Sequence, residues 1–196
     1  SHFVDLPDRE LPHPDFPFLC LLVSGGHTQI VRVDSPTEME IIGTTIDDAA
    51  GEAFDKCAKV MGLPYPGGPV IDRLAKEGNR DAFKFAKPRV EELNYSFSGL
   101  KTAVINIIHN MEQKGEEIPK EDVCASFRKA VVDCLTKNFI KAAEDLGVKT
   151  LVTAGGVSAN SLLRRELQKA CSEHGYQLYM PDLSLCGDNA AMVGSQ

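Results

Sequence analysis

The chain has 196 residues, of which 43% are hydrophobic and 25% are charged, and this balance is typical of a globular protein with a substantial core. Its formal net charge of −7 argues against broad, sequence-independent binding to polyanions, which depends on many Lys and Arg contacts to phosphate. No apolar run approaches the roughly eighteen residues of a membrane span, and the first residues lack a secretory signal pattern. We therefore expect a soluble, cytoplasmic protein that does not associate with membranes.

Three strand-like segments open the fold. They cover residues 17–24, 27–34 and 38–45. Gly25 and Gly26 join the first two segments, and a Gly-Gly pair at such a place is typical of a hairpin. A helix is expected next over 47–61, with Asp47 or Asp48 as its N-cap, because apolar residues recur on one face of this stretch.

The middle of the chain begins with a stretch rich in proline and glycine, residues 63–69, which breaks the helical pattern. A short helix is expected near 70–78. A further helix is expected to open at 96–102 and to run to about Met111. We interpret residues 62–118 as an insertion.

The last part of the chain begins with a long helix that starts at Pro119 and runs to Gly147. The apolar stripe predicted along one face of this helix consists of Val123, Phe127, Val131, Leu135, Phe139 and Ala142. After it we expect a strand at 149–153, a helix at 160–174, a strand at 176–180 and a helix that begins after Asp188. The element order β-β-β-α-β-α-β-α with a helical insertion is that of the ribonuclease H-like half of the actin-like ATPase fold. We therefore expect an α/β fold of this class, by analogy of order.

The six cysteines include no C-x-x-C pair, and several of them fall inside apolar stretches. A reduced cysteine in such a place packs as a small hydrophobic side chain. We therefore expect neither a zinc knuckle nor a disulfide framework.

Two glycine doublets, Gly25-Gly26 and Gly155-Gly156, each follow an apolar run that predicts a buried strand. Bare backbone N–H groups at strand ends suit a phosphate or a nucleotide. Taken alone, the first doublet is more often a plain hairpin turn. The second doublet has Asn160 as a helix cap close by, and its simpler interpretation is a tight strand-to-helix turn.

Several other residues allow two interpretations. Asp55 lies on the polar face of the first helix, where it is either solvated or hydrogen-bonded to ribose hydroxyls. The Gly67-Gly68-Pro69 stretch is an ordinary loop or a surface for a sugar or base, with Asp72 one helical turn further on. Asp188 is an N-cap or a ligand of a divalent metal. No H-x-x-x-H or H-E-x-x-H spacing is present, so a self-contained metalloprotease motif is absent.

Six blocks of sequence together resemble one family, the bacterial TsaD transferases, formerly labelled glycoprotease or O-sialoglycoprotein endopeptidase. These blocks lie at 22–29, 47–56, 65–69, 97–102, 155–160 and 188–192. The family has two ribonuclease H-like halves with a nucleotide cleft between them. The resemblance implies an acyltransferase that makes threonylcarbamoyladenosine in tRNA. Its members transfer a threonylcarbamoyl group from threonylcarbamoyl-adenylate to the exocyclic amine of the adenosine beside the anticodon.

The resemblance also implies roles for individual residues. Those expected to line the phosphate and acyl part of the ligand are Leu22, Val23, Ser24, Gly25 and Gly26. Those expected to hold ribose are Asp55, Gly68 and Asp72. Asn160 is expected to contact the nucleoside, and Asp188 to bind the metal. We find no acid/base pair within the chain that could carry the chemistry alone.

The family's first half and its H-x-x-x-H metal ligands have no counterpart in this sequence. We therefore expect residues 1–16 to be a linker from a missing N-terminal lobe and 17–196 to be a C-terminal lobe that is inactive alone. The implied cofactor is one divalent metal, iron or zinc, per full-length subunit, with its site incomplete here. The implied partners are tRNA, threonylcarbamoyl-adenylate or an adenine nucleotide, a paralogous glycoprotease-like subunit and a small ATPase subunit.

Other functions remain open at this point. An actin-like ATPase or sugar kinase lobe would use the same glycine loops to hold ATP and Mg²⁺. That hypothesis is weakened because the hairpin has Ser24 where an Asp-Gly-Gly turn would supply a carboxylate. A non-catalytic scaffold subunit is a third hypothesis. The old glycoprotease label is a fourth, disfavoured by the missing protease motif.

Overall fold

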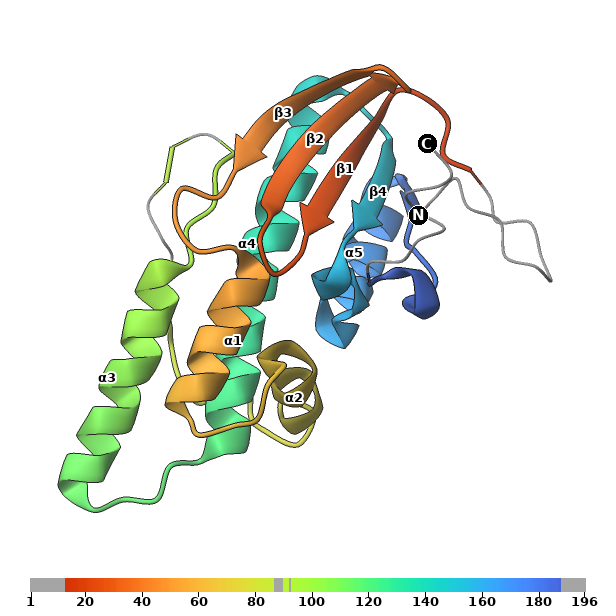
Figure 1. Ribbon diagram of the computed structural model, residues 1–196. Helices are drawn as coiled ribbons and strands as arrows, with labels where there is room; N and C mark the ends of the chain where they lie inside the picture. Colours follow the sequence, from red (N-terminus) through yellow and green to blue (C-terminus); the bar gives the residue numbers. More distant parts are fainter. Residues whose placement is uncertain (1–12, 87–89, 92, 188–196) are drawn as a thin grey trace.

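The strands of the computed structural model, which describes residues 13–86, 90–91 and 93–187, form one mixed sheet in the order β3-β2-β1-β4-β5 (Figure 1). Their bounds are Phe18–Val23 (β1), Thr28–Ser35 (β2), Glu38–Thr44 (β3), Thr150–Ala154 (β4) and Gln177–Tyr179 (β5). The β1-β2 and β2-β3 pairs are antiparallel, whereas β1-β4 and β4-β5 are parallel. This is the expected order, with three strands joined directly and two reached through helices.

The helices cover one end of the sheet and one of its faces. Their bounds are Ala50–Val60 (α1), Gly67–Leu74 (α2), Ser98–Lys114 (α3), Lys120–Leu146 (α4) and Ser161–His174 (α5). In Figure 1, α4 runs from the sheet down past α1 and α2, and α3 lies on the far side of α1 from α2. The predicted apolar stripe of α4 is fully buried, as Phe127, Leu135 and Phe139 show. This long helix therefore ties the sheet to the helical end of the molecule.

The predicted hairpin at Gly25-Gly26 is confirmed. Val23 pairs with Thr28 at the end of the β1-β2 ladder, and the Ser24 N–H donates to the His27 carbonyl at 2.8 Å. Ser24 Oγ also accepts from the His27 N–H at 3.1 Å. The turn is thus closed by its own hydrogen bonds.

The predicted N-cap of α1 is wrong. The helix begins at Ala50, and the cap residue Ala49 makes no side-chain hydrogen bond to it. The first-turn N–H groups are satisfied instead by the hairpin, because Ala50 donates to Thr28 Oγ1 at 2.8 Å and Gly51 donates to the Ser24 carbonyl at 3.1 Å. A cap from another segment replaces the local one.

Asp47 serves a different helix. Its carboxylate accepts from Ser96 Oγ at 2.5 Å, the Phe97 N–H at 2.8 Å and Ser98 Oγ at 2.7 Å, at the start of α3. Partial desolvation raises the pKa of Asp47, but these hydrogen bonds outweigh it and hold the pKa below the ordinary value of 3.8. Asp47 therefore fastens the start of α3 to the segment before α1.

The short helix α2 begins earlier than the sequence predicts, at Gly67, and ends at Leu74. The first N–H groups of a helix have no partner within it, so Pro69 in the first turn costs no hydrogen bond. The stretch interpreted as a loop is therefore helical. Both α2 and α3 pack against α1 and α4. The insertion over 62–118 stays a prediction.

Candidate functional site

A pocket of about 400 Å³ lies at the carboxyl ends of β1 and β4. Leu22 and Ala154 pair in register in these parallel strands, so the two glycine doublets that follow them lie at the same edge of the sheet. Both doublets contribute to the pocket, through Gly25 and Gly156. Its other walls come from α1, α2 and the short 3-10 turn Gly156–Ala159 (η1). Open α/β sheets bind ligands at this kind of edge.

Five of the residues singled out from the sequence line this one pocket. They are Gly25, Asp55, Gly68, Asp72 and Asn160. Leu22, Val23, Ser24 and Gly26 are not on its surface, although they adjoin it in the chain. Val23 is fully buried in the core, and Ser24 closes the hairpin turn. Asp188 lies outside the residues that the structure describes.

Glycine at the pocket wall is not required by the protein's own packing. A Cβ atom added to Gly25 or Gly68 would meet no atom within 4 Å, and one on Gly156 would meet only the Cys186 carbonyl oxygen, at 3.9 Å. None of these three glycines adopts a positive φ angle. The absent side chains therefore leave bare backbone open to whatever fills the pocket.

At three other positions glycine is required by packing, and of these Gly51 lines the pocket whereas Gly67 and Gly155 do not. A Cβ on Gly51 would lie 2.6 Å from the Ser24 carbonyl oxygen, and one on Gly67 would lie 2.5 Å from Ala58 Cβ. Gly155 has a φ of 92°, and a Cβ there would collide with the Val23 carbonyl. We call these three residues the packing seam, because they hold α1, α2 and η1 close to their neighbours. The sequence analysis did not single out Gly51.

Asp55 is half-buried, and its Oδ1 atom accepts from the Gly67 N–H at 2.7 Å. The carboxylate therefore lies at the N-terminus of α2, where the helix dipole favours a negative charge. The interpretation of Asp55 as a solvated side chain is incomplete, because one of its oxygens fixes α2 to α1. The same carboxylate also lines the pocket.

Asp72 forms an ion pair with Arg128 of α4, with 2.9 Å between Oδ1 and Nη1, and both side chains are largely buried, 16% and 9% exposed. Arg128 also donates to the Asp72 and Ala75 carbonyls, at 3.0 and 3.2 Å. Ser161 Oγ donates to Asp72 Oδ1 at 3.0 Å. This network fastens α2, α4 and α5 together. The sequence analysis did not single out Arg128, although a charged residue directly after Phe127 of the apolar stripe is a signal that could have found it.

Asn160 is the N-cap of α5, as the sequence predicts. Its Oδ1 atom accepts from the Leu162 and Leu163 N–H groups, both at 3.1 Å, and the residue is 8% exposed. The side-chain oxygen is therefore committed to the helix. The Asn160 side chain that lines the pocket is therefore held in a fixed orientation by its hydrogen bonds to α5.

Metal ligation is not tested by the described residues. Among them, no group of three or more His, Cys, Asp or Glu side chains could hold an ion. The cysteines form no disulfides, and burial raises the pKa of Cys57 and Cys124 to about 12, which keeps both as neutral thiols. The expected metal at Asp188 stays a prediction. Within the same part of the chain, no helix has the length and apolar character needed to cross a membrane.

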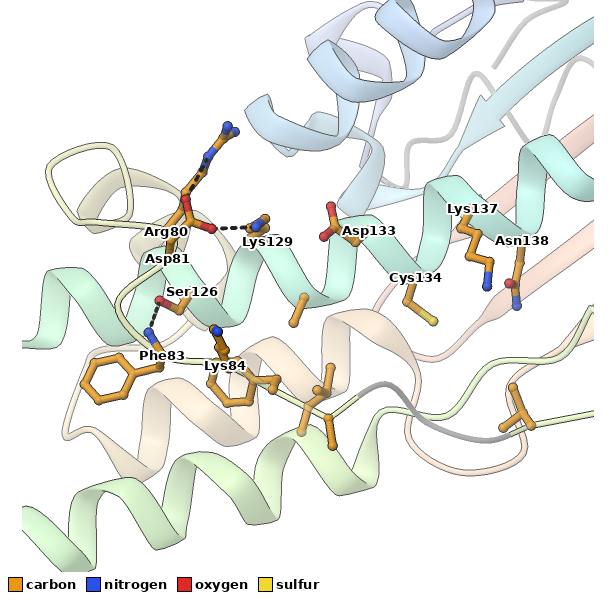
Figure 2. A pocket seen from close by; sticks show the side chains of 15 residues that line it. Arg80, Asp81, Phe83, Lys84, Ser126, Lys129, Asp133, Cys134, Lys137 and Asn138 are labelled. Carbon is orange, nitrogen blue, oxygen red and sulfur yellow. Dashed lines mark hydrogen bonds and ion pairs between the residues drawn. The ribbon is translucent and has the colours of Figure 1, made fainter.

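A second pocket, of about 350 Å³, lies between α4 and the segment that follows α2 (Figure 2). Figure 2 shows Asp81 bonded to Lys129, at 2.6 Å, and the Phe83 N–H bonded to Ser126 Oγ, at 3.1 Å. Lys84 and Lys137 also line it. None of the residues predicted from the sequence lies here, so the first pocket is the candidate site.

Comparisons of the sequence with a family model and with curated relatives agree on one family. A family model described as tRNA N6-adenosine threonylcarbamoyltransferase matches residues 6–195. A curated relative of that name from Porphyromonas gingivalis is 51% identical, over 98% of this chain and 58% of its own length. A relative from Clostridium perfringens is 52% identical, over 100% of this chain and 57% of its own length. The chain thus spans little more than half the length of these curated relatives.

Solved structures resemble the fold. Full-length HypF in a phosphate- and nucleotide-bound form matches with a TM-score of 0.67 and 15% identity, over 92% of this chain and 32% of that one. HypF from T. kodakarensis matches with a TM-score of 0.56 and 21% identity, over 82% of this chain and 20% of that one. Together with the strand order, this likeness confirms the expected α/β fold class.

Proposed function

This chain belongs to the tRNA N6-adenosine threonylcarbamoyltransferase family, and on that premise we propose that the whole protein that carries it transfers a threonylcarbamoyl group from threonylcarbamoyl-adenylate to an adenosine of tRNA. The acceptor is the exocyclic amine of the adenosine beside the anticodon. The observation that supports this most directly is that Gly25, Asp55, Gly68, Asp72 and Asn160 line a single pocket.

The proposed reaction is an acyl transfer. The amine nitrogen forms a bond to the carbamoyl carbon, and the bond from that carbon to the phosphate oxygen of the adenylate breaks. The amine loses a proton, and adenosine monophosphate leaves. The backbone N–H of Gly25 is proposed to stabilise charge that develops on the acyl and phosphate oxygens. The open space beside Gly25 supports a close approach of the ligand to the backbone. Gly26 is proposed to support this turn, because its N–H donates to Ser24 Oγ at 3.3 Å and it does not line the pocket.

The nucleoside part of the donor is proposed to lie along α2. Asp55 and Asp72 are proposed to bind ribose hydroxyls, Gly68 to contact the sugar through its backbone, and Asn160 to contact the nucleoside. Asp55 Oδ1 already accepts from the Gly67 N–H, and Asp72 Oδ1 from Arg128 and Ser161. Asp55 would therefore contact ribose mainly through its second oxygen. The second oxygen of Asp72 also accepts from the Ser161 N–H, at 3.3 Å, so it would be shared between that group and ribose.

One divalent metal per full-length subunit, iron or zinc, is proposed, with Asp188 as one ligand and the other ligands outside this chain. When bound, the metal would act as a Lewis acid toward a carbonyl or phosphate oxygen. The family resemblance supports this proposal, as it does a paralogous glycoprotease-like subunit and a small ATPase subunit as partners. A tRNA substrate is consistent with a cytoplasmic protein.

Gly68→Ala in the whole protein tests the proposed site. A Cβ on Gly68 would project into the open space of the pocket, where it would compete with the ligand. We therefore expect at least a tenfold loss of affinity for an adenine nucleotide. Calorimetric titration with adenosine monophosphate measures this loss. The same variant should lower threonylcarbamoylation of tRNA, assayed with the partner proteins and the adenylate.

Gly99→Ala is the matched control. Gly99 is the second residue of α3, as Gly68 is of α2, and a Cβ there also meets nothing within 4 Å, but Gly99 does not line the pocket. We expect its nucleotide affinity to equal that of the wild type. Unchanged affinity in Gly68→Ala, or an equal loss in both variants, would show that the nucleotide binds elsewhere.

A further inference from the structure

We propose that Arg73 and Lys76 form a phosphate-binding rim at the mouth of the pocket, which contacts the tRNA backbone next to the target adenosine. This inference rests on the proposed function and names residues for the acceptor substrate. Both side chains line the pocket and both residues are exposed to solvent. Arg73 lies in the last turn of α2, and Lys76 lies in the turn that follows the helix, where its backbone N–H donates to the Arg73 carbonyl at 3.2 Å.

The two cations lie at one end of the pocket. Gly68 is at the start of α2, and a helix rises 1.5 Å per residue, so Arg73 lies roughly 8 Å further along the axis, with Lys76 in the turn that follows. Gly25 belongs to the hairpin that packs on Gly51, in the first turn of α1. If the donor's phosphate lies at Gly25 and its ribose at Gly68, the two cations lie beyond it. A polynucleotide entering the pocket would place its own phosphates there.

The charge balance of the pocket supports an anionic ligand at this end. Asp72 is neutralised by Arg128, and Asp55 accepts from the Gly67 N–H. Within the described part of the chain, the side chains of Arg73 and Lys76 make neither an ion pair nor a hydrogen bond, and both charges therefore remain available. The next cation along, Arg80, lies 4.0 Å from both Asp81 and Glu166.

The net charge of this chain opposes a polyanionic substrate, so cations without a carboxylate partner are the expected points of contact with tRNA. The chain carries a formal charge of −7, which repels a polyanion at long range. Two uncompensated cations at the mouth of the pocket would attract the RNA backbone there, whereas the negative charge of the rest of the chain would disfavour RNA binding elsewhere. Arg73 also lies in the last turn of α2, where a cation stabilises the helix dipole, so the experiment must separate binding from helix stability.

The test is the double variant Arg73→Ala/Lys76→Ala in the whole protein, assayed with its partner proteins. We expect the KM for tRNA to rise 10- to 100-fold, while kcat and the affinity for adenosine monophosphate stay unchanged. The slope of log affinity for tRNA against log salt concentration should fall by about 1.4–1.8, since each lost phosphate contact removes about 0.7–0.9. The charge-conserving variant Arg73→Lys/Lys76→Arg should keep most of the tRNA affinity.

Lys114→Ala/Lys149→Ala is the matched control, because it removes the same charge from two residues that do not line the pocket. Lys114 is in the last turn of α3, and Lys149 directly precedes β4, at the end of that strand opposite to the pocket. Equal losses of tRNA affinity in the two double variants would overturn the proposal in favour of a general charge effect. Loss of adenosine monophosphate affinity instead of tRNA affinity would assign the cations to the donor and overturn it as well.

Wild-type protein in the same assays separates this inference from the proposed function. If the wild type transfers no threonylcarbamoyl group to tRNA, the proposed function fails. If it does, and the Arg73→Ala/Lys76→Ala variant binds tRNA as tightly as the wild type, only the phosphate-binding rim is wrong.

Discussion

The packing seam and the pocket wall use glycine for different reasons, and adjacent residues of α2 show the contrast. A Cβ on Gly67 would press on Ala58 and Asp55, whereas one on Gly68 would meet nothing. In the seam, glycine lets two backbones approach each other. On the wall, glycine leaves space that the protein does not fill. A glycine that packing does not require, on the surface of a pocket, therefore indicates the approach of a ligand.

Arg128→Ala should have the largest effect on stability. It leaves the buried Asp72 carboxylate without its partner, and loss of one member of a buried ion pair costs about 3–5 kcal/mol. Urea denaturation measures the loss. Lys129→Ala is the control, since its ion pair with Asp81 is exposed to solvent and should contribute little to stability. Similar losses in both variants would show that the buried Asp72–Arg128 pair contributes no more to stability than an exposed ion pair.

Gly155→Ala should follow. The new Cβ would collide with the Val23 carbonyl, and a positive φ adds strain, so we expect a loss of about 2–4 kcal/mol in the free energy of unfolding. Gly175→Ala separates the two causes, because Gly175 has a φ of 69° but open space around it. It should lose only about 1–2 kcal/mol, from backbone strain alone. Equal losses would argue against a close contact between Gly155 and β1.

Gly67→Ala and Gly68→Ala should change stability in opposite directions. The first should lose about 1–3 kcal/mol through overpacking. The second should gain up to about 1 kcal/mol, because alanine has the higher helix propensity. Thermal denaturation of both variants tests this. A destabilised Gly68→Ala variant would contradict the distinction between seam and wall.

The smallest expected effect on stability concerns Asp47, which lies outside both the packing seam and the pocket wall. Its pKa is lower in the folded state than in the unfolded chain, so its contribution to stability is present above pH 4 and is lost as the pH falls through the folded pKa. Asp47→Asn should flatten the stability profile below about pH 4. If the free energy of unfolding of the variant and of the wild type depended on pH in the same way below about pH 4, Asp47 would not be the link between the segment before α1 and α3.

Local signals in the sequence predicted the strands, the apolar stripe of α4 and the cap at Asn160. The contacts that it missed join residues far apart. Thr28 caps a helix 22 residues later, and Asp47 binds the N–H of a residue 50 positions away. The sequence marked residues of the pocket wall through strand ends and glycines. It marked Gly67 and Gly155 only as members of glycine pairs and missed Gly51, because a close contact of the packing seam depends on how distant elements pack.

The hairpin that caps α1 has a consequence for amide exchange. The first N–H groups of a helix usually open first and exchange quickly with solvent. Here the Ala50 and Gly51 amides donate to Thr28 and Ser24, beside the central strand of the sheet. Their deuterium uptake should therefore be as slow as that of β1, and the wall of the pocket at Gly25 should open only when the sheet itself unfolds.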